Sequence, residues 1–213
     1  MEDKLKGKDA ATARRTLLVA TNNPGKVRDL MELLNGLPIR LVTPAELGLR
    51  LEVPETGASY AENARLKARA FAARSGMTSL ADDSGLEIAI LENWPGVESA
   101  RCAGPGATDA ARRALVLSRL AGSAVAERGA RFVCHVVVAN PTAVLAEAQG
   151  TVEGRIALSP SGSGGFGFDA IFVPDGSEHT FAEISWREKN EISHRARAIA
   201  ALRPFFERFA RTS

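Results

Sequence analysis

The sequence predicts an α/β protein in which helices flank one mixed β-sheet. The first observation is a strand–helix–strand unit, in which an apolar run at residues 17–21 precedes a helical pattern and a second strand at 39–43. The second is a β-branched strand at 132–139, which the turn Asn140-Pro141 connects to a return strand at 143–150. The first unit favours parallel pairing and the hairpin is antiparallel, so we expect a mixed sheet in two lobes with a cleft.

The elements of the first half follow from apolar spacing and end signals. Apolar residues recur at helical spacing from Val27 to Leu34, and Asn35-Gly36 ends that helix. A second helix is predicted over 59–74, after a polar entry that ends in serine. The run at 79–84 is predicted to be a strand that ends in "DDSG", and 86–91 is predicted to be another strand.

The second half adds two helices around the hairpin. One helix is predicted over 109–120, with its apolar face turned inward. A glycine-rich loop at 162–167 precedes a strand predicted at 170–173. The last helix is predicted over 193–209, with Ser193 as its N-cap and with Pro204 kinking or splitting it.

Composition excludes several classes of protein. The 213 residues carry 27 Lys and Arg against 25 Asp and Glu, so the formal charge of +2 argues against a nucleic acid polymer as partner. Cys102 and Cys134 are too few for a disulfide framework, and we expect both to be packing residues in a reducing compartment.

The chain is expected to act without a membrane. No apolar run in the sequence reaches membrane-spanning length. Residues 1–15 are polar and charged, so we expect a disordered tail there rather than a secretory signal. Residues 16–213 are then expected to form a single domain, and the location is expected to be cytoplasmic.

The stretch "ATNNPGK" places a small polar turn between the first strand and the first helix. Free N–H groups at a helix start attract anions, and Lys26 adds a full positive charge, so Thr21 to Lys26 can bind phosphate. A capped loop with a solvated lysine is the alternative. The stretch is not a Walker A loop, because the Gly-Lys-Ser/Thr ending is absent.

The stretch "LADDSGLEI" places Asp82 and Asp83 where an apolar strand is predicted to end. Adjacent carboxylates can hold Mg²⁺ and supply a general base, and Glu55 can complete such a site. A solvated turn is the alternative reading. Lys67, on the helix after Glu55, faces the same phosphates if the site exists, or makes surface pairs if it does not.

Two further stretches gather groups suited to a purine base. In "GSGGFGFDAIFVP", Phe166 or Phe168 can stack on a base and Asp169 can accept from a base N–H, or both rings belong to the core. In "EKNEISHRARA", Lys189, His194 and Arg195 gather hydrogen-bond donors at the start of the last helix, which otherwise reads as a solvated helix start.

The ordered set of these stretches resembles the inosine triphosphate pyrophosphatase family, and in particular its bacterial branch, which acts on dITP and XTP. The matching pieces are "ATNNPGK", "ETGASYAENARLKA", "ADDSGLEI", "GVESARCAG", "GGFGFDAIFVP" and "EKNEISHRARA". The resemblance implies hydrolysis of nonstandard purine nucleoside triphosphates to the monophosphate and pyrophosphate, with Mg²⁺. It also implies an elongated two-lobed α/β fold and a homodimer.

The resemblance also implies individual roles. Glu55 and Asp83 would hold Mg²⁺, and Asp83 would be the general base. The residues implied to bind substrate are Thr21, Asn22, Asn23, Pro24, Gly25 and Lys26 around the triphosphate, Lys67 and Ser84 beside it, and Phe166, Gly167, Phe168, Asp169, Lys189, His194 and Arg195 around the base. Phe168 stands where relatives often carry Tyr or Trp.

Donors at His194 and Arg195 with an acceptor at Asp169 fit the edge of hypoxanthine, where O6 accepts and N1–H donates. Adenine has the reverse pattern of donor and acceptor at these two positions, so it would leave buried groups unpaired. Three other readings remain open. They are a pyrophosphatase for other modified nucleotides, such as methylated pyrimidines, a catalytically silent nucleotide-binding regulator, and a nucleic-acid-binding module.

Overall fold

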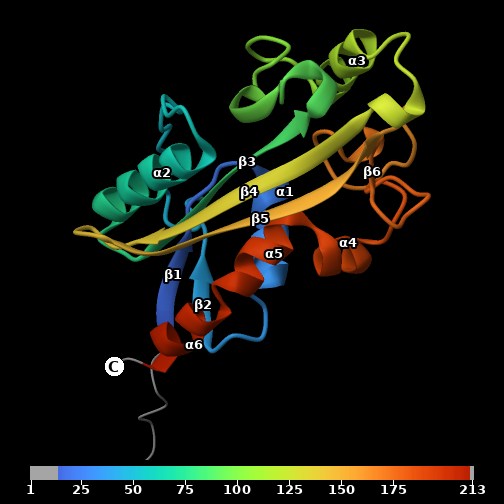
Figure 1. Cartoon of the computed structure of the whole chain (residues 1–213). Coiled ribbons are helices and arrows are strands. Elements are labelled where there is room, and N and C mark those ends of the chain that lie inside the picture. The colour runs from blue at the N-terminus through green and yellow to red at the C-terminus, as the bar shows by residue number, and fades with distance from the viewer. Residues whose placement is uncertain (1–13, 212–213) are drawn as a thin grey trace, which may run out of the picture.

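The computed structural model describes residues 14–211, and within that range one six-stranded sheet organises the fold (Figure 1). The strands are β1 (Arg15–Val19), β2 (Ile39–Val42), β3 (Ser79–Ile88), β4 (Gly129–Ala139), β5 (Val144–Ile156) and β6 (Phe172–Pro174). Their order across the sheet is β2-β1-β3-β4-β5-β6. β1 pairs in parallel with β2 and β3, whereas β3 to β6 pair antiparallel. The predicted mixed sheet is confirmed.

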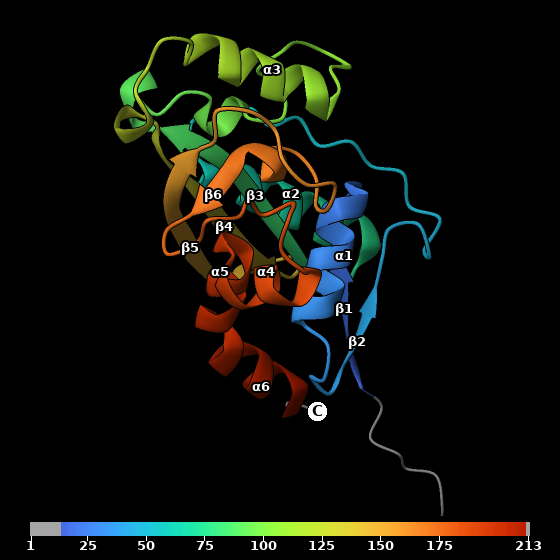
Figure 2. The same cartoon turned by 90° about the vertical axis from the view of Figure 1, so that its right-hand side faces the viewer.

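Helices cover both faces of the sheet because the strand residues alternate between two apolar clusters (Figures 1 and 2). Leu17 and Val19 pack on the side of α1 (Pro24–Leu33), α5 (His194–Ala201) and α6 (Arg203–Arg211). Leu18 and Ala20 pack on the side of α2 (Tyr60–Ser75). Side chains on one strand therefore belong to two different environments.

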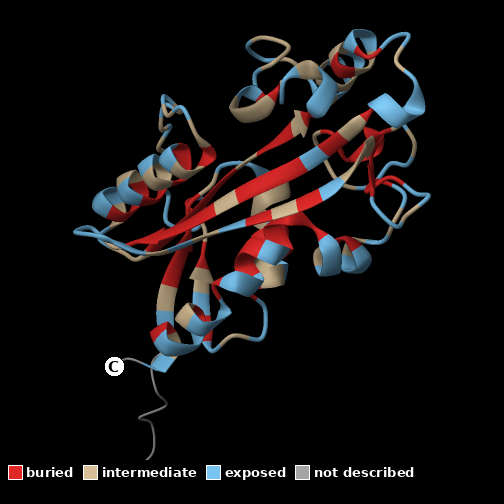
Figure 3. Cartoon of the chain, viewed as in Figure 1, coloured by how far each residue is buried: buried red, intermediate tan, exposed pale blue. Residues whose placement is uncertain are grey.

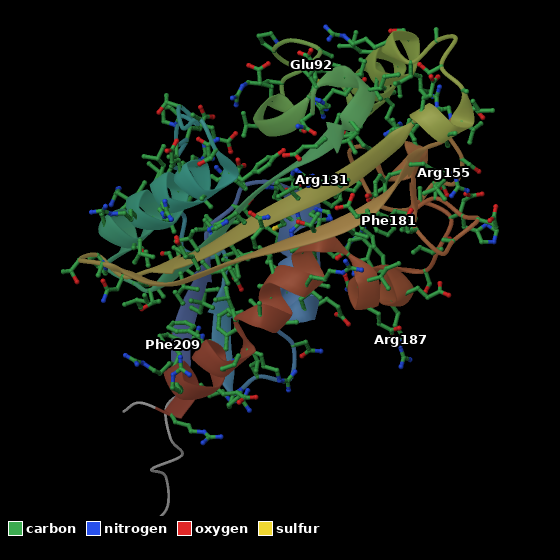
Figure 4. All side chains as sticks on the ribbon, viewed as in Figure 1. Glu92, Arg131, Arg155, Phe181, Arg187 and Phe209 are labelled. Atoms are coloured by element: carbon green, nitrogen blue, oxygen red, sulfur yellow. The ribbon has the colours of Figure 1, made fainter. Side chains whose placement is uncertain are left out.

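A second lobe forms where β3, β4 and β5 run past the short strands β1 and β2. Helix α3 (Asp109–Arg119) covers this end in both ribbon views (Figures 1 and 2). Its Val116 packs in an apolar cluster with Phe132, Phe172 and Phe181. Figure 4 labels Phe181 of this cluster and Phe209 of the α1–α5–α6 cluster, which lie at separate ends of the molecule.

Burial is concentrated in the middle of the sheet, where β3 and β4 run between the helices (Figure 3). This buried region includes charged residues, because Asp82 is 1% exposed and Asp83 is 4% exposed. Both cysteines are free, as expected. Within residues 14–211 no helix has the length and apolar character needed to cross a bilayer.

Four details of the predicted elements were wrong. The strand predicted at 170–173 begins only at Phe172, because Asp169–Ile171 forms a 3₁₀ turn. The runs at 79–84 and 86–91 are one strand, β3, up to Ile88, because β4 pairs with every residue through "DDSG". The residues after it, Ala89–Leu91, form a short 3₁₀ turn. Helix α4 (Trp186–Ile192) was missed, although Ser185 and Glu188 form a capping box at its start.

The predictions for the two ends of the chain have different outcomes. The last helix is split into α5 and α6, with Pro204 in the first turn of α6, where its missing N–H is tolerated. Most of the expected tail, residues 1–13, lies outside the described residues, and Arg15 is the first residue of β1.

Candidate active site

Asp82 and Asp83 lie in the middle of β3, and their side chains project to opposite faces of the sheet. Asp82 faces α1 and α5, where its Oδ2 lies 3.1 Å from Lys26 Nζ and 3.0 Å from Arg195 Nη2. Asp83 faces α2, where its Oδ1 lies 2.9 Å from Lys67 Nζ. The expected acidic pair at a strand end is thus two carboxylates in two separate environments.

On the α2 side, Lys67 joins Glu55 to Asp83. Its Nζ lies 2.7 Å from Glu55 Oε1, in addition to its contact with Asp83. Asn63, one turn earlier on α2, donates through Nδ2 to Asp83 Oδ2 at 3.2 Å. The side-chain oxygen of Ser59 caps this helix. Lys67 therefore points toward the predicted metal site rather than making surface pairs along its helix, and its contact with phosphates stays a prediction.

Burial sets the protonation of this cluster. It raises the pKa of Asp83, and the attraction of Lys67 and Lys26 does not cancel that effect. Glu55 is also desolvated, but Lys67 brings its pKa below the ordinary value. Burial opposes the charge on Lys67, yet the neighbouring Asp83, Asp82 and Glu55 raise its pKa, so it remains an ammonium. A buried aspartate with a raised pKa is a stronger proton acceptor than an exposed one.

Glu55 and Asp83 suit a divalent cation because their oxygens already share one positive charge, the Lys67 ammonium. Within residues 14–211 no group of three or more His, Cys, Asp or Glu is arranged to hold a metal. Mg²⁺ needs few protein carboxylates when substrate phosphates and water fill its other positions. The donor set therefore suits a metal that binds together with phosphate.

The turn between β1 and α1 is held by its own side chains. Asn23 Oδ1 accepts from the N–H groups of Gly25 at 2.9 Å and Lys26 at 3.2 Å. Asn22 Nδ2 donates to the carbonyl of Leu51 at 2.9 Å. Asn23 is thus the N-cap of α1 with Pro24 in its first turn, as the sequence favours, and its side chain occupies the N–H groups of Gly25 and Lys26. The Lys26 side chain is the positive group that the turn presents.

Arg195 is buried, and four of its five N–H groups donate to Asp82, Asp29 and Ser84. Burial and the cations around Asp82 act in opposite directions, and Lys26 and Arg195 hold the pKa of Asp82 far below its usual range. This pairing leaves one N–H group of Arg195 for a ligand, and its contact with a base stays a prediction. Arg195 fixes the positions of Asp82 and Ser84.

The glycine loop brings Phe166 onto the turn that carries Lys26. A Cβ atom at Gly25 would lie 2.5 Å from the Phe166 ring, so only glycine permits this approach. The Lys189 ammonium lies 5.0 Å from the ring centre of Phe166. Phe168 is 5% exposed and belongs to the apolar cluster under α3, so Phe166 is the ring available for stacking.

Asp169 and Lys189 contact Phe166, and His194 lines the same cavity. Asp169 Oδ2 accepts from Phe166 N at 2.9 Å and from Lys189 Nζ at 2.5 Å. His194 stacks on Phe132, and its Nδ1 has no partner among the described residues. Burial, with the neighbouring cations, holds the pKa of His194 well below its usual range, so the neutral ring offers one donor and one acceptor.

Two cavities join these groups into one groove. The base-side cavity, of about 100 Å³, is lined by Asn23, Lys26, Ser84, Phe166, Gly167, Phe168, Asp169, Lys189, His194 and Arg195, among others. The carboxylate-side cavity, of about 390 Å³, is lined by Thr21, Asn22, Asn23, Lys26, Glu55, Lys67, Asp83 and Ser84, among others. Asn23, Lys26, Ser84 and Ala100 line both, whereas Pro24 and Gly25 line neither.

Sequence reasoning missed several groups in this region. Asp29, which pairs with Arg195, is a lone acidic residue on the buried face of α1, and no motif marks it. Arg101 Nη1 lies 3.5 Å from Glu55 Oε2 and belongs to "GVESARCAG", a stretch quoted above without a role. Asp109, Arg112 and Arg113 of α3 also reach the base side.

Comparisons with known proteins agree with this geometry. A model of the Ham1 family matches residues 17–205. A dITP/XTP pyrophosphatase of Exiguobacterium is 43% identical over 186 residues, which covers 87% of this chain and 94% of that protein. A dITP/XTP pyrophosphatase of Deinococcus deserti is 45% identical over 188 residues, which covers 88% of each.

Solved structures give the same relationship in three dimensions. A HAM1 protein from Coxiella burnetii matches with a TM-score of 0.81 and 39% identity, covering 91% of this chain and 99% of that chain. A nucleoside-triphosphatase, dITP/XTP pyrophosphatase, from Mycobacterium abscessus matches with a TM-score of 0.69 and 42% identity, covering 89% and 98%.

Proposed function

The chain belongs to the Ham1 family, and from that premise we propose that its groove binds and hydrolyses nonstandard purine nucleoside triphosphates. The substrates are ITP, dITP and XTP, and the products are the nucleoside monophosphate and pyrophosphate. One observation carries this proposal. Lys26 and Ser84 line both cavities, so a single ligand can reach from the aromatic side to the carboxylates. Removal of these substrates keeps their bases out of DNA and RNA.

The chemical step is attack of water on the α-phosphorus. A new P–O bond forms, the bond from that phosphorus to the bridging oxygen breaks, and pyrophosphate leaves with the electron pair. Asp83, whose pKa burial raises, accepts the proton from the water. The ammonium groups of Lys26 and Lys67 lie where the triphosphate binds and stabilise the negative charge that develops.

The metal ion in this proposal is Mg²⁺, held by Glu55 and Asp83. When bound, it supplies positive charge to the phosphate oxygens. If a cation were bound there, Glu55 and Asp83 would no longer need the charge of the Lys67 ammonium, which would then be free to donate to the phosphates. Metal binding and phosphate binding by Lys67 are therefore coupled.

At the other end of the groove, the base stacks on Phe166. Asp169 and Lys189, held together at 2.5 Å, offer an acceptor and a donor, and neutral His194 adds one of each. Arg195 acts on this end mainly by fixing Ser84, and its remaining N–H can donate to O6. This arrangement supports recognition of a base with O6 and N1–H.

Three further parts belong to the proposal, of which the homodimer rests on the resemblance to the inosine triphosphate pyrophosphatase family and the other two rest on the sequence alone. They are a single catalytic domain over residues 16–213, a homodimer, and a cytoplasmic location. Light scattering of the purified protein tests the assembly, and a measured mass of one chain would reject the dimer.

The reaction is tested by incubation with ITP, dITP, XTP, GTP, ATP and dTTP in Mg²⁺, followed by identification of each product. We expect monophosphate and pyrophosphate from ITP, dITP and XTP at rates far above those from ATP and dTTP. Release of diphosphate and inorganic phosphate would reject attack at the α-phosphorus. Binding of ITP without turnover would identify a silent regulator, and preferential cleavage of a methylated pyrimidine nucleotide would identify the related enzyme class.

A further inference from the structure

Two side chains of α3 hold both backbone polar groups of one residue in the glycine loop. Asp109 Oδ2 accepts from Gly167 N at 2.7 Å, and Arg113 Nη1 donates to Gly167 O at 2.7 Å. Asp109 and Arg113 stand one turn apart, so both lie on the face of α3 that meets the loop. Neither residue has a role in the function proposed above.

The backbone of Gly167 links the two phenylalanines of this loop. Its φ of +60° is a left-handed conformation that favours glycine. Phe168, which follows it, is anchored in the apolar cluster under α3. Phe166, which precedes it, faces the turn at Gly25. The position of the Gly167 backbone therefore decides where the Phe166 ring lies.

The same helix end also contacts the segment between the two cavities. Arg112 forms an ion pair with Asp109 and donates to the carbonyl of Ala100 at 3.0 Å. Ala100 lines both cavities, and Asp109 and Arg112 line the base-side cavity. Hydrogen bonds to ionised groups are stronger than neutral ones, so these contacts fix the loop and the segment relative to α3.

We propose that Asp109 and Arg113 are positioning residues for base recognition, which they serve by holding Gly167 so that Phe166 can stack on the purine. This inference rests on the proposed function of the groove. The two residues act through the loop and not on the phosphates, because neither lines the carboxylate-side cavity. Their loss weakens binding of the base and leaves binding of the triphosphate unchanged.

The first test compares Arg113→Met with Arg119→Met, which lies on the same helix but packs on Trp94. Two probes are titrated in Mg²⁺, a nonhydrolysable ITP analogue and inorganic triphosphate. We expect Arg113→Met to weaken the ITP analogue by about tenfold, the loss of one charged hydrogen bond, without changing triphosphate affinity. Arg119→Met is expected to change neither affinity, and Arg113→Lys is expected to restore part of the binding. Equal weakening of both probes, or no change in either, overturns the proposal.

The second test needs no ligand. Amide exchange of Gly167 is measured by NMR in wild type and in Asp109→Ala, with the α3 amide of Val116 as internal control. We expect Gly167 to exchange about tenfold faster in the variant, because its acceptor is gone, while Val116 is unchanged. Unchanged exchange at Gly167 would show that Asp109 does not hold the loop, and it overturns the proposal. If wild type fails to bind the ITP analogue, the proposed function falls, and this exchange measurement still decides whether α3 holds the loop.

Discussion

Asp82 and Asp83 are consecutive residues of β3, yet their carboxylates pair with different cations on opposite faces of the sheet. Asp82 Oδ2 lies 3.0 Å from Arg195 Nη2, whereas Asp83 Oδ1 lies 2.9 Å from Lys67 Nζ. The pleat of the strand separates the two side chains. Asp82 lines neither cavity, whereas Asp83 lines the carboxylate-side cavity and is available for chemistry.

Asp83→Asn is expected to reduce turnover by at least about 10²–10⁴-fold with little change in melting temperature, because the amide cannot accept the proton from water. Lys67 keeps Glu55 as its ion partner, so the fold should tolerate the change. Steady-state kinetics with ITP and a melting curve check this. Near wild-type turnover would show that Asp83 is neither base nor essential ligand.

Asp82→Asn is the matched comparison for that variant. The structure predicts a loss of stability of about 3 kcal/mol or more, because Arg195 would remain buried without a full counter-charge. Urea unfolding gives the value. A stable Asp82→Asn protein would mean that Asp29 alone suffices for Arg195.

Arg195→Ala is expected to destabilise the protein by about 3–5 kcal/mol, because it removes the shared partner of Asp82 and Asp29 from the interior. The sequence instead predicts Arg195 as a donor to the O6 edge of the base. The decisive measurements are urea unfolding and the ratio of kcat/KM for ITP and ATP. A normal unfolding midpoint with a reduced ratio would restore the earlier interpretation.

Lys26→Met is expected to weaken both binding and turnover, because Lys26 lines both cavities and supplies charge to the triphosphate. Calorimetry with the nonhydrolysable ITP analogue measures the affinity. The same analogue binding as tightly to Lys26→Met as to wild type would leave Lys26 as the partner of Asp82 only.

Gly25→Ala is expected to lower kcat/KM for ITP by about tenfold or more, because the new methyl group would overlap the Phe166 ring and displace it. Gly129→Ala is the control, since a methyl group there meets nothing within 4 Å. The measurement is kcat/KM for ITP in both variants. Equal, unimpaired activity would show that the contact between the turn and the ring is dispensable.

The pH dependence should follow Asp83. In the metal-free protein, burial keeps its proton bound above the ordinary aspartate value of 3.8, so the carboxylate becomes protonated as the pH drops through that raised pKa. Lys67→Met removes the nearest cation, which should raise the pKa further. The Asp83 carboxyl resonance, titrated by NMR in metal-free protein, gives both values. A midpoint at lower pH in Lys67→Met would contradict this account.

Local patterns in the sequence predicted most of the fold. The strands at 17–21 and 132–139 and the helix over 59–74 were found within a few residues, because apolar spacing and capping residues act within one element. The predicted ends of elements were wrong where contacts with a neighbouring element determine them. The acidic "DDSG" looked like a turn, but each of its residues lies opposite a residue of β4 in the antiparallel register, so the strand continues through it.

For the candidate site, too, the sequence predicted the residues but not their partners. The sequence by itself determined which residue types were present, including Glu55, Asp83, Lys67 and the phenylalanines of the glycine loop. The tertiary contacts, which no local pattern predicts, place Lys67 between Glu55 and Asp83 and pair the Arg195 guanidinium with Asp82 and Asp29. The physical reason is that these charges are buried, and a buried charge must find a partner wherever the packed chain places one, however far away that partner lies in the sequence.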